Sequence, residues 1–460
     1  MTTNSTMIKV SPKGLRKHAL NCIHSQTPFF VWGNPGIGKS RILQALVEKM
    51  GFHFEDIRLS QIESVDLRGL PAKDDKVIKT PILDAAGKPV FVPVYDEKGV
   101  PQVDEKGEAV LEQAFNVTKE TTVAWAMPDF LRRAKEQWEK YKKPTAYFFD
   151  ELNSGSPATM AAAYQFINDR RIGCFELGSK DVVFAAGNLE SDGGVTNSMP
   201  LPLANRFRHY LMDVNTEQWL NFASENGMHP YVLAYLSIGA NGSKLQDFNV
   251  DRLLSSDEKA FATPRSWEML SKALFAAYGD YQPTATKKAL DEEGDDFYVH
   301  EEDDKINEND ISVIAASCVG SGIAVEFAGF VKEGMDLPKA RDILDGKKFD
   351  LPQLKSKTSA QYFIANDCSH ALKEMKTKLE EVKKEAGDKS KQYEDVLKSY
   401  VKSMEHYILF AKAHFARELF VFGIITVMLK RYKVMPMPNH MDKKVFDLVA
   451  TEFNAARLKN

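Results

Sequence analysis

The residues from 33 to 40 have the spacing of a loop that binds phosphate groups. They read Gly33-Asn34-Pro35-Gly36-Ile37-Gly38-Lys39-Ser40 and fit the pattern G-x-x-x-x-G-K-[S/T]. The glycines let the backbone curl so that successive N–H groups point at phosphate oxygens, and a following helix adds its positive end. In such a loop Lys39 reaches the β- and γ-phosphates and Ser40 ligates Mg²⁺. The pattern therefore predicts a nucleotide site with ATP and Mg²⁺ as ligands.

Two acidic residues supply the second half that such a site needs. Asp150 and Glu151 follow directly on the apolar run from 146 to 149, which reads as a buried strand. At the end of that strand Asp150 would hold Mg²⁺ through water, and Glu151 would orient or deprotonate the attacking water. A third apolar run, 182–187, ends in Asn188, whose amide could fix the same water. The alternative for Asn188 is an asparagine that opens a turn.

The apolar runs alternate with helical patterns in the first half of the chain. Strands are expected near 27–32, 52–59, 145–149 and 182–186, with helices at 12–26, 41–50 and 157–169. This alternation predicts an α/β fold with a parallel sheet. The region 71–122 interrupts it with repeats of Asp-Glu-Lys-Gly at 96–99 and 104–107. We expect a β-hairpin or small meander there, with a flexible loop as the alternative.

The bulk composition is that of an ordinary soluble protein. The 460 residues are 43% hydrophobic, 27% charged and 10% aromatic, and the net charge is -4. The chain as a whole lacks the excess of basic residues that is typical of nucleic-acid-binding proteins. The four cysteines stand far apart, so we expect reduced thiols, with a disulfide or zinc site as the minor alternative. The longest clean apolar run, 419–429, is too short to span a bilayer, and we expect a cytoplasmic protein without a membrane span.

The second half of the chain reads as mainly helical. Residues 216–335 carry an acidic segment at 291–310, which we expect to be a solvated loop. Charges of alternating sign at 370–400 predict one long exposed helix, and the apolar stretch 407–434 predicts a buried helix. We therefore expect three domains: an α/β nucleotide-binding subdomain at 1–215, a helical lid at 216–335, and an accessory helical region at 336–460.

Together the three strand ends resemble the AAA+ family of ATPases. The segment Leu203–Arg208 is similar to that family's arginine-finger region, and Thr263–Trp267 to its sensor 2 at a lid helix. Three further stretches, at 66–71, 150–153 and 170–173, resemble the MoxR-like branch and its stand-alone bacterial and phage members. The resemblance covers about 27–335. The long repetitive insert departs from the pattern, and nothing after about 336 matches it.

The resemblance implies a role for two arginines and a mode of action. Arg206, or alternatively Arg208, would reach the γ-phosphate held by a neighbouring subunit, an effect worth about 10³ to 10⁵ in rate. Arg265 would act from the lid. Surface arginines or ordinary ion pairs are the alternatives for these positions. Residues 71–122 and 170–178 would line the pore of a ring.

The same resemblance implies partners. The expected assembly is a ring of identical subunits, a hexamer, that hydrolyses ATP and remodels or activates a partner protein, often one with a von Willebrand A domain. A phage-encoded member would work in the host cytoplasm. Two other readings stay open, a nucleic-acid-directed motor and a slow nucleotide-gated assembly scaffold.

Overall fold

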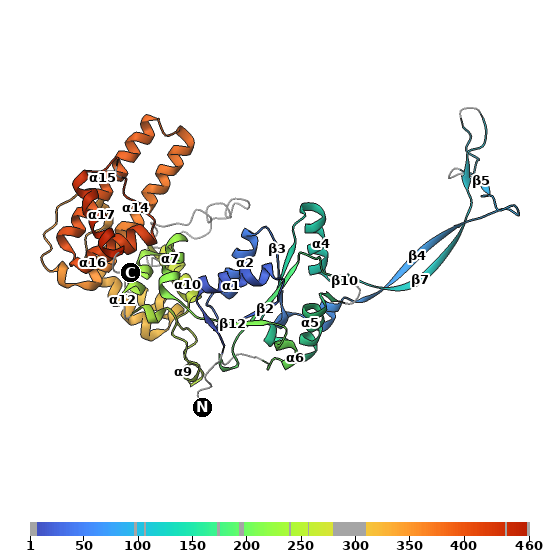
Figure 1. Ribbon diagram of the computed structural model, residues 1–460, viewed down its shortest axis with the longest axis horizontal. Helices are drawn as coiled ribbons and strands as arrows, with labels where there is room; N and C mark the ends of the chain where they lie inside the picture. The colour runs from blue at the N-terminus through green and yellow to red at the C-terminus, as the bar shows by residue number, and fades with distance from the viewer. Residues whose placement is uncertain are drawn as a thin grey trace.

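The computed structural model of the chain has three parts that lie in a row (Figure 1). An α/β body stands in the middle, a group of helices lies on one side, and a long β arm extends from the other side. The structure describes residues 7–95, 99–104, 107–172, 175–192, 197–238, 241–255, 257–278, 310–437 and 439–457. The expected solvated loop at 291–310 lies almost wholly outside the described residues.

The body is built on a six-stranded parallel sheet, as the sequence predicts. Its strand order is β1-β12-β2-β11-β8-β3. In that order the bounds are Lys9–Val10, Arg208–Met212, Phe29–Trp32, Val182–Gly187, Thr145–Asp150 and His53–Arg58. The central strands β2, β11 and β8 are almost entirely buried. Near-continuous apolar strands of this kind are required when helices cover both faces of a parallel sheet.

Helices close both faces of the sheet. Helices α1 (Pro12–His24) and α2 (Lys39–Lys49) cover one face, where Leu15 and Leu43 pack against Phe148. The opposite face is covered by α3 (Ser64–Arg68), α4 (Asp129–Tyr141) and α5 (Pro157–Asp169), which bury Leu67 and Phe166. Short elements complete the body: η1 (Leu59–Gln61), η2 (Leu152–Ser154), η3 (Glu190–Asp192), α6 (Leu201–Ala204), β9 (Arg171–Ile172) and β10 (Phe175–Glu176). Strands β9 and β10 pair antiparallel within the segment 170–178.

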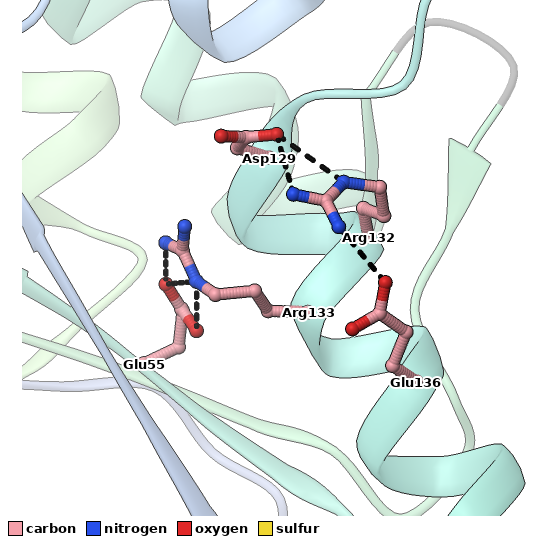
Figure 2. A network of polar contacts seen from close by, with 5 residues as sticks. All are labelled: Glu55, Asp129, Arg132, Arg133 and Glu136. Carbon is pink, nitrogen blue, oxygen red and sulfur yellow. Dashed lines mark hydrogen bonds and ion pairs between the residues drawn. The ribbon is translucent and has the colours of Figure 1, made fainter.

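A buried carboxylate fastens α4 to the edge strand of the sheet. Glu55 of β3 is 4% exposed and accepts hydrogen bonds from the Arg133 guanidinium, with Nε at 3.2 Å from Oε1 (Figure 2). The ion pair raises the pKa of Arg133. Arg132, one residue earlier, instead pairs along the exposed side of the helix with Asp129 and Glu136 (Figure 2). Helix α4 is thereby held where the chain returns from the arm.

The arm is the hairpin expected in the interrupting region. Strands β4 (Pro71–Pro81) and β7 (Phe115–Trp125) pair antiparallel along their whole length, so the hairpin runs three residues beyond the expected end at 122. The chain enters and leaves it at one point, since the N–H of Ala126 donates to the carbonyl of Leu70 at 2.8 Å.

Beyond its stem the arm branches twice. The backbone groups of Ile82, Val90 and Ala114 bond one another in a closed cycle, each N–H donating to the next carbonyl at 2.8 or 2.9 Å. One branch is a tight turn at 83–89, and the other is the short pair β5 (Phe91–Pro93) and β6 (Leu111–Gln113). A second cycle joins Val94, Gln102 and Val110, and beyond it the bridged pairs Tyr95–Pro101 and Val103–Ala109 flank the two Asp-Glu-Lys-Gly repeats. Residues 96–98 and 105–106 of these repeats lie outside the described residues.

The rest of the chain is helical. The bounds are α7 (Thr216–Glu225), α8 (Pro230–Ser237), η4 (Asn241–Leu245), α9 (Val250–Ser255), α10 (Pro264–Tyr278), α11 (Ile311–Val319), α12 (Ser321–Met335), α13 (Ala340–Leu344), η7 (Leu354–Ser356), α14 (Thr358–Ala386), α15 (Lys391–His414), α16 (Arg417–Val421), η8 (Phe422–Arg431) and α17 (Lys443–Arg457). One hydrophobic cluster runs from Trp219 to Val449. The expected lid and accessory region therefore share a core, and the boundary at 335 stays a prediction.

Two expected helices are interrupted. The single helix expected over 370–400 is wrong: α14 ends before Gly387, whose φ of 83° caps a helix, and Ser390 begins α15 by accepting from the N–H of Tyr393. The buried stretch 407–434 is also broken, at Phe415, and continues as α16 and the π-helix η8. None of the helices that the structure describes combines the length and apolar composition that a membrane crossing requires.

Candidate functional site

Residues 33–38, which we call the glycine loop, lie between the central strand β2 and the first turn of α2. Gly36 and Gly38 have φ of 75° and 91°, values that residues with a Cβ rarely adopt. At Gly33 an added Cβ would meet the Ile37 side chain at 2.6 Å. Glycine is therefore favoured at these positions by backbone conformation or by lack of space, as a loop that curls around a phosphate group requires.

Lys39 is buried beneath this loop. Its side chain is enclosed to 8% exposure, and Nζ donates to the carbonyls of Gly33 at 2.5 Å and Asn34 at 3.1 Å and to Oδ1 of Asn188 at 2.9 Å. Burial lowers the pKa of Lys39 to about 8, against the opposing effect of nearby carboxylates, chiefly Asp150. The ammonium group thus sits among neutral acceptors that an anion could replace.

The end of β8 brings a carboxylate onto the loop. Oγ of Ser40 donates to Oδ2 of Asp150 at 2.8 Å, although the two residues are far apart in sequence. A serine hydroxyl beside a carboxylate is a donor set of hard oxygen atoms, which suits Mg²⁺. The structure therefore brings the two side chains predicted as metal ligands into contact.

Glu151 lies next to this pair in a strained conformation. Its φ of 52° and ψ of 38° fall in the left-handed region, which is uncommon for a residue with a side chain. Its Oε2 accepts from Oγ of Ser60 at 2.5 Å, just beyond the end of the neighbouring strand β3. Backbone strain of this kind clusters at functional sites.

Asn188 is held in place by a second asparagine. Its side chain accepts from Lys39, while its carbonyl accepts from Nδ2 of Asn153 at 2.8 Å. Asn153 is fully buried, and its carbonyl accepts from the N–H of Asn197 at 2.6 Å. An added Cβ at Gly187 would meet Oδ1 of Asn153 at 2.2 Å. The strand end of β11 is therefore tied to the segment that follows Glu151.

The segment predicted to form the lid touches the glycine loop directly. The N–H of Arg265, at the start of α10, donates to the carbonyl of Gly36 at 3.2 Å, and an added Cβ at Gly36 would meet Oγ1 of Thr263 at 2.9 Å. One turn after Arg265 in α10, Glu268 forms an ion pair with Arg41 of α2 at 2.8 Å. The guanidinium of Arg41 also lies 5.1 Å from the centre of the Phe222 ring in α7.

The two candidate finger arginines differ in their surroundings. Arg208 lies in β12 and donates to Oδ1 of Asn21 at 2.7 Å, so its own chain holds it. Arg206 lies on the exposed turn between α6 and β12 and makes one long hydrogen bond, 3.5 Å, to the hydroxyl of Tyr164. Neither guanidinium belongs to the cluster around Lys39.

The structure thus brings together most of the residues singled out in the sequence. Lys39, Ser40, Asp150 and Asn188 are joined by hydrogen bonds, Glu151 is adjacent, and Arg265 approaches through its backbone. Arg206 stands apart from them.

Three further residues belong to the cluster and were not assigned roles from the sequence. They are Ser60, Asn153 and Asp192, and desolvation by burial raises the pKa of Asp192 despite the charge of Lys39. Ser60 follows a strand end, so the reasoning applied to Asp150 and Asn188 could have found it. Asp192 carries no such signal.

The cysteines add no second site within the described residues. Cys22 and Cys368 are buried free thiols, Cys318 is partly buried, and Cys174 lies outside the described residues. No group of three or more His, Cys, Asp or Glu side chains in the described ranges could hold a metal ion.

The parallel sheet with a phosphate-type loop between β2 and α2 is the α/β fold of a P-loop NTPase core, here followed by a C-terminal helical extension. No protein-family model matches the sequence, and no curated protein matches it. Solved structures do. A Cytophaga hutchinsonii protein described as a "putative ATPase" aligns at a TM-score of 0.29 and 16% identity, over 48% of this chain and 53% of that one.

A RuvB mutant from Thermotoga maritima aligns at a TM-score of 0.27 and 12% identity, over 76% of this chain and 83% of that one. The alignment with the Cytophaga protein spans only about half of that protein. Neither alignment identifies a function for this chain.

Proposed function

We propose that this chain is an ATPase of the AAA+ type that works as a ring of identical subunits and remodels or activates a partner protein. The observation that carries the proposal is the convergence of Lys39, Ser40 and Asp150 on one glycine loop, with Glu151 beside them. Lys39 and Ser40 begin α2, whereas Asp150 ends β8 and Glu151 follows it, so the fold brings together two segments that are far apart in sequence. A buried ammonium group beside a hydroxyl and two carboxylates fits a magnesium-bound nucleoside triphosphate.

Each residue has a role that follows from its place. Lys39 exchanges neutral carbonyl acceptors for phosphate oxygens, and Ser40 and Asp150 hold the metal. Mg²⁺ neutralises charge on the phosphates when it is bound. Glu151 leaves the Ser60 hydroxyl and accepts the proton of the attacking water, while Asn188 orients that water. Arg265 moves together with the glycine loop and carries the lid with it.

The position of Arg206 is best explained if this arginine acts at the nucleotide site of a second copy of the chain. Arg206 is exposed, its hydrogen bond to Tyr164 is long, and it is not among the residues hydrogen-bonded to Lys39, Ser40 or Asp150. Leu201, five residues earlier at the start of α6, is also exposed, to 83%. In a ring this surface faces the neighbour's nucleotide, and Arg206 supplies positive charge to the γ-phosphate there.

ATP turnover then becomes relative motion between subunits. The resemblance to the MoxR-like branch favours a hexamer that acts on a partner protein, including one with a von Willebrand A domain. The branched arm extends away from the body and is the part best placed to meet such a partner (Figure 1).

Dependence on protein concentration tests the shared site. Hydrolysis per subunit should fall when dilution takes the protein below its assembly threshold, with the assembly state followed by mass photometry. Constant activity per subunit down to a demonstrated monomer would contradict the proposal. Arg206→Ala should bind ATP normally and hydrolyse it 10³-fold more slowly or worse. If it hydrolyses ATP at full speed, Arg208→Ala is the next variant to measure.

Two active-site variants separate binding from turnover. Lys39→Ala should lose both nucleotide binding and hydrolysis, whereas Glu151→Gln should bind ATP and stall. The stalled variant is suited to capturing the partner in ATP. Stimulation of the wild-type ATPase by the captured protein supports remodelling. Stimulation by DNA or RNA instead would point to a nucleic-acid motor, and stimulation by neither to a scaffold.

A further inference from the structure

His209 connects the strand that precedes the glycine loop to the helix that precedes Arg206. It lies in β12 beside Trp32, the last residue of β2, and the two rings are stacked with centroids 6.1 Å apart. Nε1 of Trp32 is 2.9 Å from Nδ1 of His209. On the other side of the ring, Nε2 of His209 is 2.8 Å from the carbonyl of Ala204, the last residue of α6.

The chemistry of the partners determines which nitrogen carries the proton. An indole N–H can only donate, so Nδ1 of His209 must accept the bond from Trp32. A carbonyl can only accept, so Nε2 must carry the proton and donate to Ala204. His209 is therefore a neutral imidazole whose two nitrogens are both in use. It forms a bridge from the end of β2 to the end of α6.

Helix α6 has few other contacts that could fix its position. It is four residues long, and of its side chains only Leu203 is buried. Phe207, just after Arg206, is also buried and lies with its ring edge-on to that of His209, 6.3 Å away. Arg206 itself is exposed. The direction of its side chain thus depends on how the short turn from Ala204 to Phe207 is held.

We propose that His209 is a positioning residue for Arg206, and that its donation to Ala204 sets the arginine in the direction from which it reaches the neighbouring subunit's nucleotide. The inference rests on the proposed function, in which Arg206 acts between subunits. The hydrogen bonds of His209 go to Trp32 and Ala204 and not to Lys39, Ser40 or Asp150. Loss of the bridge should therefore lower kcat while leaving the KM for ATP and the binding of ATP unchanged.

Two substitutions divide the bridge into its halves. The amide nitrogen of His209→Gln occupies the place of Nε2 and can still donate to Ala204. The amide oxygen of His209→Asn occupies the place of Nδ1 and can still accept from Trp32 but cannot reach Ala204. We expect His209→Gln to retain most of the wild-type kcat and His209→Asn to lose on the order of 10- to 100-fold. Melting temperatures of the two variants provide the check on folding.

Mixed assemblies show on which side of the interface the defect lies. Subunits with His209→Asn retain an intact site but present a misplaced arginine, and subunits with Glu151→Gln present a correct arginine but cannot hydrolyse. Mixing them should restore hydrolysis above the sum of the two separate activities. Mixing His209→Asn with Arg206→Ala should restore nothing, because neither copy presents a correct arginine.

The outcomes distinguish the positioning role of His209 from the proposed function on which it rests. If Arg206→Ala is impaired while His209→Asn turns over at the wild-type rate, the positioning role is wrong and the shared site stands. A defect of His209→Asn that Glu151→Gln subunits do not relieve also overturns it, since the damage is then in its own site. If Arg206→Ala itself is fully active, Arg206 has no role in hydrolysis and the positioning role of His209 falls with it, while the shared site is then tested with Arg208→Ala.

Discussion

Lys39 is a buried cation whose three hydrogen-bond acceptors are all uncharged oxygen atoms. Burial lowers its pKa to about 8, so at higher pH much of the free protein holds a neutral amine. A bound triphosphate favours the ammonium form and raises that pKa. We therefore expect ATP binding to take up a proton above pH 8, and affinity to fall by up to about tenfold per pH unit there.

Calorimetry in buffers of different ionisation enthalpy measures the proton uptake. Below pH 7 both free and bound protein carry the charged lysine, so the heat of binding should not depend on the buffer. Lys39→Arg is the matched variant, since a guanidinium keeps its proton at every pH used. Uptake that persists in Lys39→Arg would assign the proton to another group.

Gly187 provides a second test at the scale of single residues. An added Cβ would meet Oδ1 of Asn153 at 2.2 Å and the Phe30 ring at 2.7 Å. Gly187→Ala should therefore displace Asn153, release Asn188 from its place, and cost about 1–3 kcal/mol of stability. We expect slower hydrolysis with ATP still bound. Gly322→Ala, where an added Cβ meets nothing within 4 Å, is the control and should match wild type in both measurements.

The positions of the strand ends in the sequence predicted which side chains would meet. Contacts that depend on an unusual local backbone conformation were not predicted. Ser40, Asp150 and Asn188 were predictable because parallel strands bring their carboxyl ends to one edge. The contact of Ser60 with Glu151 depends on a residue in the left-handed region, and that of His209 with Ala204 on a turn four residues long. Neither conformation has a periodic signature in sequence. The roles assigned to Glu151, Asn188, Arg206 and Arg265 stay predictions.

At the scale of elements, the arm is an insertion whose two ends meet. Because Leu70 and Ala126 are hydrogen-bonded, deletion of 71–125 with a short glycine linker should leave the sheet and the glycine loop intact. We expect unchanged nucleotide binding and an unchanged melting temperature for the body. A shorter deletion that removes only the branches beyond Ile82 and Ala114 should behave in the same way. Loss of nucleotide binding in either deletion would show that the arm supports the site.

The elements were predicted to different degrees. Strands and helices of the body were clear because buried parallel strands are continuous apolar runs between amphipathic helices. The arm was recognised as β structure, but its two branch points were not, since they are cycles of backbone hydrogen bonds among residues distant in sequence. The helical hairpin at 387–390 was missed although Gly387 is a standard helix-ending residue, because the charge pattern continues across it.

At the scale of the whole molecule, the lid and the C-terminal helices are joined by one core. Gly334 of α12 lies against Phe363 of α14, where an added Cβ would meet the ring at 2.1 Å. Gly334→Ala should therefore destabilise both regions together. Hydrogen exchange should rise to a similar extent in α8, α10, α14 and α15 if they form one cooperative unit.

Gly329→Ala lies on the same helix in open space and is the matched control, with stability equal to or slightly above wild type. Faster exchange confined to α10 and α12 would instead restore a boundary near 335. Thermal unfolding of the two variants gives an independent reading of the same difference.

The first turn of α2 touches two parts of the molecule. Ser40 points to Asp150, and the next residue, Arg41, points to Glu268 and Phe222 in the lid. We therefore expect the angle of the predicted lid and the contents of the glycine loop to be thermodynamically linked, and such linkage is reciprocal. When a neighbouring subunit or a partner protein binds the lid, it changes the affinity for nucleotide by a certain factor. Nucleotide must then change the affinity of that subunit or partner for the lid by the same factor.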